Sequence, residues 1–285
     1  MNEKQLVVKT DNALANAAYS LSLGEKRLIL LAIARANGDR DALKNITVHA
    51  DEYAKAFNVT RQGAYMALSE SALQLFDRRF SYQLLTPTGC LMTSQRRWVR
   101  GIDYIETEAR VNILFSDDVL PLLCDLQNRF AYYVLEQVAY LTSVHAIRLY
   151  ELLISWRSTG KTPLFKLADF RQKLGIEESE YPRMTDFKRW VLDAAIAQIN
   201  KHTDIFVAYE QHKRGRSITG FTFTFKQKKL PCDPKIIDLI NGTADAEKRQ
   251  NITKAQAELM ARTGETWPDL INRLSRDYCI TGLKA

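Results

Sequence analysis

Residues 205–225 read IFVAYEQHKRGRSITGFTFTF, and this stretch decides the fold of the second half of the chain. Residues alternate in polarity on both sides of a turn at Gly215, and Phe221, Phe223 and Phe225 fall on one face. A period of two is typical of β-strands, and glycine is favoured in tight turns. The stretch therefore predicts a β-hairpin, and its tip carries three cations, which are Lys213, Arg214 and Arg216.

The residues before this hairpin have mostly helical periodicity. The pattern predicts an amphipathic helix over residues 141–156, a short strand over 162–166, a brief helix over 168–174 ended by Gly175, and a long helix over 185–202. Ile147, Tyr150, Leu153 and Ile154 define the apolar face of the first of these helices. Helix, strand, helix, helix and hairpin is the order of a winged helix-turn-helix domain.

The same order occurs once before in the chain. Ser22 and Glu25 have the spacing of a capping box, which predicts the start of a helix over residues 23–36. A short strand (46–48), two helices (51–57 and 61–76) and strands at 79–85, 90–99, 104–107 and 111–115 follow. The sequence predicts an α+β fold of two tandem winged-helix domains, residues 1–135 and 136–229, and a C-terminal tail over 230–285 with a short helix at 253–262.

The positive charge of the chain is concentrated in the second domain. The 285 residues carry a formal net charge of +7, and residues 181–229 hold ten Lys or Arg against four acids, a balance of +6. A basic stripe on a nearly neutral body indicates contact with nucleic-acid phosphates. A basic face that is only solvated is the alternative.

The start of the long helix at 185–202 holds the residues best suited to read DNA bases. An α-helix fits the major groove of B-DNA, and its N-terminal residues meet the base edges. Arginine and lysine can donate to guanine, and aspartate can accept from cytosine or orient an arginine. The candidate base-reading residues are Arg183, Thr185, Asp186, Lys188 and Arg189.

Two further groups are candidates for contact with DNA. The hairpin tip Lys213, Arg214 and Arg216 can follow backbone phosphates or enter the minor groove, and an ordinary exposed basic turn is its alternative. In the first domain the candidates are Arg61 and Gln62, at the start of a helix, and Arg96 and Arg97, on a strand; ordinary solvated positions are the alternative there.

The patterns of an enzyme, a metalloprotein and a membrane protein are not found in the sequence. The four histidines and four cysteines lack metal-ligand spacing, and residues 158–162 lack the glycine that a P-loop needs at the position of Ser155. No apolar run is long enough for a membrane span and no signal peptide begins the chain, so we expect a cytoplasmic protein without catalysis, metal or cofactor. Leu14, Leu21 and Leu28 are seven residues apart and favour core packing, with a dimer contact as the alternative.

The chain resembles the Rep_3-type replication initiator proteins of iteron-carrying plasmids, over about residues 5–228. The matching stretches are LSLGEKRLIL (21–30), AIRLYELL (146–153), DFKRWVL (186–192) and the hairpin KRGR (213–216) followed by alternating phenylalanines. Trp190 departs from the family, in which a third basic residue often follows this Phe-Lys-Arg, so that contact is either missing or replaced by packing.

The resemblance implies that the two winged helices grip one direct repeat of double-stranded DNA, an iteron. It implies that monomers help to open an AT-rich segment of the origin and recruit the host replication initiator and the replicative helicase. It also implies that dimers formed through the first domain, in equilibrium with monomers, bind an inverted operator and repress synthesis of the protein. A tandem winged-helix transcriptional repressor without a role at an origin is the alternative.

Overall fold

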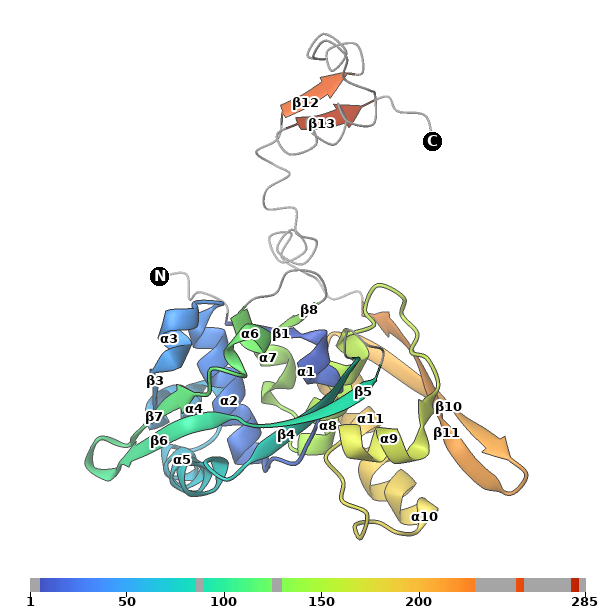
Figure 1. Ribbon diagram of the computed structural model, residues 1–285, viewed down its shortest axis with the longest axis horizontal. Helices are drawn as coiled ribbons and strands as arrows, with labels where there is room; N and C mark the ends of the chain where they lie inside the picture. The colour runs from blue at the N-terminus through green and yellow to red at the C-terminus, as the bar shows by residue number, and fades with distance from the viewer. Residues whose placement is uncertain (1–5, 86–89, 125–129, 229–249, 254–277, 282–285) are drawn as a thin grey trace. The chain divides into compact units, whose positions relative to one another are not determined.

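The computed structural model describes residues 6–85, 90–124, 130–228, 250–253 and 278–281 (Figure 1). The chain divides into two compact units, Met1–Lys228 and Lys229–Ala285. The first unit contains the hydrophobic core and both winged helices.

The first winged helix is built around a three-stranded sheet. Its elements are α2 (Leu23–Ala36), β3 (Ile46–His49), α4 (Ala50–Phe57), α5 (Arg61–Leu75), β6 (Val99–Ile105) and β7 (Arg110–Phe115). The sheet has the order β3-β7-β6, so the short first strand pairs with the last one and the β6–β7 hairpin projects as the wing. Helices α2, α4 and α5 are the three helices of this winged helix.

The second winged helix repeats this topology. Its elements are α8 (Val144–Ile154), β9 (Phe165–Lys166), α9 (Leu167–Lys173), a long helix made of α10 (Met184–Asp186), η2 (Phe187–Asp193) and α11 (Ala194–His202), then β10 (Ile205–Arg214) and β11 (Ser217–Gln227). The sheet order is β10-β11-β9, which is the same arrangement. The predicted pair of winged helices is therefore confirmed, with helix bounds shifted by one to three residues at most ends.

The first domain carries a hairpin that the second one lacks. β4 (Arg79–Leu85) and β5 (Leu91–Arg97) stand between α5 and the β6–β7 wing and pair in a separate sheet with β2 (Ala18–Tyr19). The expected strand over residues 90–99 therefore belongs to this inserted hairpin, and the wing begins only at Val99.

The rest of the first unit consists of short elements around the two winged helices. These are β1 (Val7–Asp11), α1 (Asn12–Asn16), α3 (Arg40–Lys44), η1 (Glu106–Glu108), α6 (Leu120–Cys124), β8 (Phe130–Val134) and α7 (Glu136–Ala139). β1 and β8 pair antiparallel. Because Leu14, Leu21 and Leu28 are all buried in the core, the core interpretation of their spacing is confirmed.

In the second unit, β12 (Gln250–Thr253) and β13 (Tyr278–Thr281) pair in parallel. The helix expected over 253–262 lies outside the described residues, apart from Thr253, which ends β12.

The capping box predicted at the start of α2 is present. The Ser22 hydroxyl accepts a hydrogen bond from the Glu25 amide at 3.2 Å, and the Glu25 carboxylate accepts from the Ser22 amide. Glu25 also forms an ion pair with Arg78 at 2.8 Å. The helix ends at Asn37, which adopts the left-handed conformation that commonly terminates helices.

Helix α8 is not amphipathic, which corrects the prediction for residues 141–156. Every residue from Ala146 to Ile154 is buried, including the charged Arg148 and Glu151. A helix that is buried on all sides has protein on every face. Here α8 packs on α1 and β8 of the first domain and on η2 and α11 of the second winged helix.

A buried ionic cluster forms around α8. The Glu151 carboxylate accepts hydrogen bonds from Lys26 and from the Tyr133 hydroxyl, both at 2.8 Å, and it pairs with Arg148 at 3.2 Å. The ammonium of Lys26 also donates to the Tyr19 hydroxyl at 2.9 Å. Each charge of this cluster is thus held by partners from other elements, as buried charges require.

Arg148 links the two winged helices directly. Its guanidinium donates to the carbonyl of Ala15 in α1 at 3.3 Å and to that of Ala17, between α1 and β2, at 2.8 Å. It also donates to the carbonyl of Lys173, at the end of α9, at 2.7 Å. The backbones meet closely here, because a Cβ added to Gly175 would lie 2.5 Å from the carbonyl oxygen of Tyr19. One side chain therefore ties the second domain to the N-terminal segment of the first.

We expect Arg148→Met to lower the free energy of unfolding by about 3–5 kcal/mol, because it leaves buried carbonyls and part of the Glu151 charge without partners. Urea denaturation followed by circular dichroism measures the loss. Asp41→Asn, which breaks the exposed ion pair with Lys44 on α3, is the control and should leave the midpoint unchanged. An equal effect of both variants would contradict the linking role of Arg148.

The Glu151 carboxylate should also make stability depend on pH. Burial acts to raise the pKa of Glu151, but Lys26, Arg148 and the Tyr133 hydroxyl outweigh it and hold this pKa below its usual value. A depressed pKa in the folded state gives stability that is complete above the unfolded value, about 4.3, and is lost as pH falls through the folded value. The destabilisation caused by Glu151→Gln should therefore shrink between pH 6 and pH 3, whereas a constant difference would contradict this assignment.

Candidate nucleic-acid interface

The long helix of the second domain has one buried and one exposed side over its first turns. Phe187, Val191 and Leu192 are buried in the core. Arg183, Thr185, Arg189 and Trp190 are exposed, and Asp186 and Lys188 are partly exposed. The structure therefore brings the five predicted base-reading residues together at the N-terminal end of one helix.

The loop before this helix is fixed by Arg171 of α9. Its guanidinium donates to the carbonyls of Tyr181, Glu177 and Glu180, and it lies 5.1 Å from the centre of the Phe187 ring. The loop ends at Arg183, whose carbonyl accepts from the Phe187 amide at 3.0 Å. The backbone that presents Arg183 and Thr185 is thus tied to the preceding helix, as in a helix-turn-helix.

The middle of the helix, residues Phe187–Asp193, is a π-helix. A π-helical turn bonds i to i+5 and is wider than an α-helical turn, and such turns are often found at functional sites. Val191 and Leu192 both face the core, while the neighbouring Arg189 and Trp190 both face outward. Trp190 is 59% exposed, so packing into the core does not replace the basic residue that often stands here in the family.

Lys188 faces the wing and not the outside of the helix. Its ammonium donates to the Gln211 side chain of β10 at 3.1 Å and lies 5.7 Å from the centre of the Tyr209 ring. The Tyr209 hydroxyl donates to Asp193 at 2.9 Å, and burial together with this bond raises the pKa of Tyr209 to about 12. These contacts fix the long helix and the wing relative to each other.

The β10–β11 wing has the predicted hairpin geometry. Arg214 pairs with Ser217 across a loop of Gly215 and Arg216, and Gly215 has a φ of 62°, which glycine adopts without strain. A bulge between His212 and Lys213 shifts the register just before the tip. In the described part of the chain, no carboxylate pairs with Lys213, Arg214 or Arg216, so the tip presents three uncompensated positive charges.

The predicted cations of the first domain are each paired with an acid. Arg61 and Gln62 are exposed at the start of α5, but Arg61 forms an ion pair with Asp51 at 2.9 Å. Arg96 pairs with Asp118 at 3.2 Å, and Arg97 with Asp77 at 3.3 Å. Arg96 and Arg97 lie on β5 of the inserted hairpin, outside both the long helix and the wing of this domain.

The wing of the first domain is acidic at its tip, which we did not predict. The short turn η1 between β6 and β7 carries the exposed Glu106 and Glu108. Glu106 accepts a hydrogen bond from the Tyr65 hydroxyl of α5 at 3.0 Å, and Glu108 pairs with Arg110 at 2.9 Å. The signal in the sequence that could have predicted this acidic tip is the pair Glu106 and Glu108, close to the turn between two expected strands. This wing is a poor surface for phosphates.

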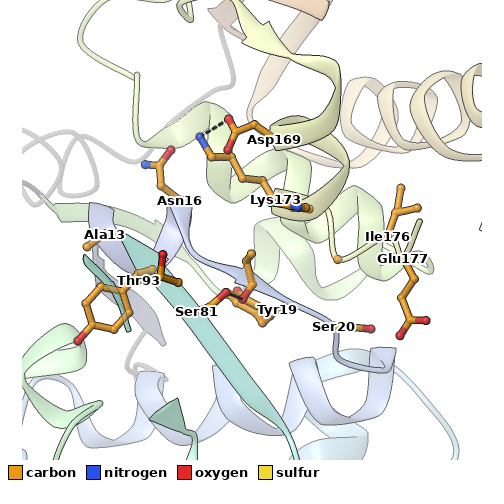
Figure 2. Close-up of a pocket in the computed structure, with 14 residues that line it drawn as sticks. Ala13, Asn16, Tyr19, Ser20, Ser81, Thr93, Asp169, Lys173, Ile176 and Glu177 are labelled. Carbon is orange, nitrogen blue, oxygen red and sulfur yellow. Dashed lines mark hydrogen bonds and ion pairs between the residues drawn. The ribbon is translucent and has the colours of Figure 1, made fainter. Parts of the chain in front are cut away.

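A cleft of about 640 Å³ lies where the two domains meet. Figure 2 shows that residues of α1, β2, β4 and β5 line one side and those of α9 the other, with Asp169 and Lys173 paired at 2.9 Å. Within the described residues, no group of His, Cys, Asp and Glu is placed to hold a metal ion. Among those same residues, every helix is too short or too polar to cross a bilayer.

Two helix-and-wing pairs in one compact unit define the class of the protein as a tandem winged-helix DNA-binding protein. In Figure 1, α5 and α10 both lie along its lower side, and the two wing tips lie at opposite ends. Models of the initiator replication protein family match residues 7–154 as its first winged helix, WH1, and residues 166–225 as its second, WH2. The chain belongs to this family of replication initiators, which confirms the resemblance in the sequence.

Similar proteins agree with this assignment. An uncharacterized 27.6 kDa protein of Escherichia coli is 27% identical over 239 residues, which are 80% of this chain and 97% of that protein. A replication initiation protein of Escherichia coli is 26% identical over 77% of this chain and 69% of its own length. The crystal structure of the Pi initiator protein in complex with iteron DNA shares the fold, with a TM-score of 0.65 and 23% identity over 80% of this chain and all of that chain.

Proposed function

We propose that the chain starts replication of a plasmid by binding iteron repeats at the origin through both winged helices. The observation that carries the proposal is the contrast in charge compensation. The helix and wing of the second domain present Arg183, Arg189 and the three wing cations without a carboxylate partner among the described residues, whereas Arg61, Arg96 and Arg97 of the first domain are all paired. Unpaired cations on an exposed surface are the ones available to phosphates and bases.

In this proposal, the role of each candidate residue of the second domain depends on whether it lies on the long helix or at the wing tip. Arg183, Thr185, Asp186 and Arg189 read base edges in the major groove, because they lie at the exposed N-terminal end of the long helix. Lys188 positions the helix against the wing through Gln211, in addition to any contact with DNA. The wing tip contacts the phosphate backbone, since its charges have no carboxylate partner among the residues that the structure describes and project from the body of the domain.

The first domain adds a weaker grip on the same DNA. We call the long helix of the second domain (α10, η2 and α11) the reading helix. Arg61 and Gln62 lie at the start of α5, the equivalent helix of the first domain, so they are the best candidates of this domain for base contact. Arg96 and Arg97 would contact the phosphate backbone of DNA only after their ion pairs with Asp118 and Asp77 open. Within this proposal residues 1–135 grip DNA and dimerise, residues 136–229 read the repeat, and residues 230–285 form a tail.

The family assignment and the named relatives support a role at an origin. A relative is named as a replication initiation protein, and the Pi initiator shares this fold. In this proposal the protein is cytoplasmic and catalyses no reaction. It helps to open the origin and recruits the host replication initiator and the replicative helicase. Its dimers repress its own expression. A tandem winged-helix repressor is the second candidate. Direct repeats of about 20 base pairs beside an AT-rich stretch, next to the coding sequence, favour the initiator.

The test of this proposal compares Arg189→Ala with Arg214→Ala. Arg189→Ala should cost about 1–3 kcal/mol on the direct repeat and leave binding to unrelated duplexes nearly unchanged, because it removes a base contact. Arg214→Ala should weaken binding to all duplexes and reduce the salt slope by about one, because it removes a phosphate contact. Fluorescence anisotropy at several salt concentrations measures both.

Lys44→Ala is the matched control, because this lysine is exposed but paired with Asp41 on α3, away from both reading helices. It should change neither the specific nor the non-specific dissociation constant. If Arg189→Ala weakened every duplex equally, the reading helix would be wrongly assigned. Incubation of the protein with supercoiled origin DNA and Mg²⁺ should leave the DNA supercoiled, whereas nicked product would contradict a protein without catalysis.

A further inference from the structure

The side chains of Arg189 and Trp190 form an exposed pair on the reading helix. The guanidinium carbon of Arg189 lies 4.7 Å from the centre of the Trp190 ring, and the indole is 59% exposed. A single exposed apolar side chain is common and requires no function. In the described part of the chain the Arg189 guanidinium has no carboxylate partner. An exposed indole that carries such a guanidinium on its ring, at the N-terminal part of a helix proposed to read DNA, is a more specific arrangement.

The neighbouring residues of the helix contact the wing or the core, unlike Arg189 and Trp190. Lys188 is directed to Gln211 and Tyr209 of the wing. Val191 and Leu192 fill the core. The π-helical turn therefore directs only Arg189 and Trp190, of these five consecutive residues, away from the domain. A ligand that approaches the exposed side of the helix meets the two together.

Stacking on the indole changes how Arg189 binds. A free arginine side chain loses rotamer entropy when it is fixed, and a guanidinium already held on an aromatic ring loses less. Within the described residues the Arg189 guanidinium donates no hydrogen bond, so its N–H groups can form the two parallel bonds that match the O6 and N7 acceptors of guanine. The ring of Trp190 thus prepares Arg189 for bidentate contact with a base.

The indole itself offers an apolar surface beside that guanidinium. In the major groove the apolar feature of a base pair is the C5-methyl group of thymine, which apolar side chains recognise. We propose that Trp190 is a specificity-determining residue: it positions Arg189 on a guanine, and its ring contacts the C5-methyl group of a neighbouring thymine. This inference rests on the proposed reading of iterons by the second domain.

The test uses the full chain and a duplex of one direct repeat from its own plasmid. A set of duplexes replaces each thymine in turn by deoxyuridine, which removes only the C5-methyl group. Trp190→Ala should weaken binding to the repeat about 10-fold, as expected when a base contact is lost. Binding to an unrelated duplex and the salt slope should stay unchanged, since no charge that neutralises a phosphate is removed.

One deoxyuridine should weaken binding by the wild-type chain and have no further effect on Trp190→Ala, because the partner of the methyl group is then absent. In the Arg189→Ala background, Trp190→Ala should cost less than it does alone, since it no longer disturbs the guanidinium. Trp190→Phe should retain part of the affinity because it keeps an aromatic ring.

Phe206→Ala is the matched control, because Phe206 is equally exposed, at 61%, but lies on β10 and not on the reading helix. It should leave discrimination between the repeat and the unrelated duplex intact. Thermal unfolding of both variants should match the wild type, since neither side chain is in the core.

Three results would overturn the inference. In the first, every deoxyuridine duplex binds the wild type as tightly as the thymine duplex does. In the second, the Trp190→Ala protein prefers the repeat as strongly as the wild type does. In the third, Trp190→Ala loses equal affinity for the repeat and for the unrelated duplex. A wild-type chain without preference for the repeat would instead overturn the proposed function, and the inference with it. The two failures are thus told apart by the wild-type measurement.

Discussion

The arrangement of the two winged helices depends on the buried guanidinium of Arg148. It bonds to backbone carbonyls on both sides of the junction, at Ala15 and Ala17 on one side and at Lys173 on the other. Burying such a charge is costly unless every donor has a partner, and the carbonyls with Glu151 supply those partners. These bonds on both sides of the junction hold α5 and the long helix of the second domain in one relative orientation.

The junction also explains why α8 is buried around its whole circumference. A helix at the edge of one domain needs only one apolar face, whereas α8 has α1 and β8 of the first domain on one side and the long helix of the second domain on the other. Its two charged residues therefore do not mark a solvent face. They hold the backbone of the neighbouring segments.

Much of the fold could be predicted from local pattern. The capping box of Ser22, the change from helical to alternating periodicity and the turn at Gly215 are each determined by residues close in sequence, and the structure has them where the pattern indicated. The burial of Arg148 and Glu151 could not be predicted, because a pattern of one helix does not show that a second domain covers its polar face. The separation of β4 and β5 from the first wing depends on pairing with β2, some sixty residues earlier.

The candidate site was predictable to a similar extent. The positions of the long helix and of the wing in the second domain follow from the order of elements, so their residues could be named as candidates for DNA contact from the sequence alone. Whether a cation is free depends on partners distant in sequence, such as Asp118 for Arg96 and Asp77 for Arg97, and local pattern does not show these pairs. The outward direction of Trp190 depends on the π-helical turn, which helical periodicity does not reveal.

The side of the protein that we propose to face DNA has unlike ends, with an acidic tip at Glu106 and Glu108 and a basic tip at Arg214 and Arg216. A chain with unlike ends has a polarity, so it can lie on an asymmetric site in only one sense. Copies placed on successive direct repeats would then all point the same way, with the basic tip of one directed toward the acidic tip of the next. Opposite charges at that boundary would attract, and neighbouring sites would be filled more readily together than singly.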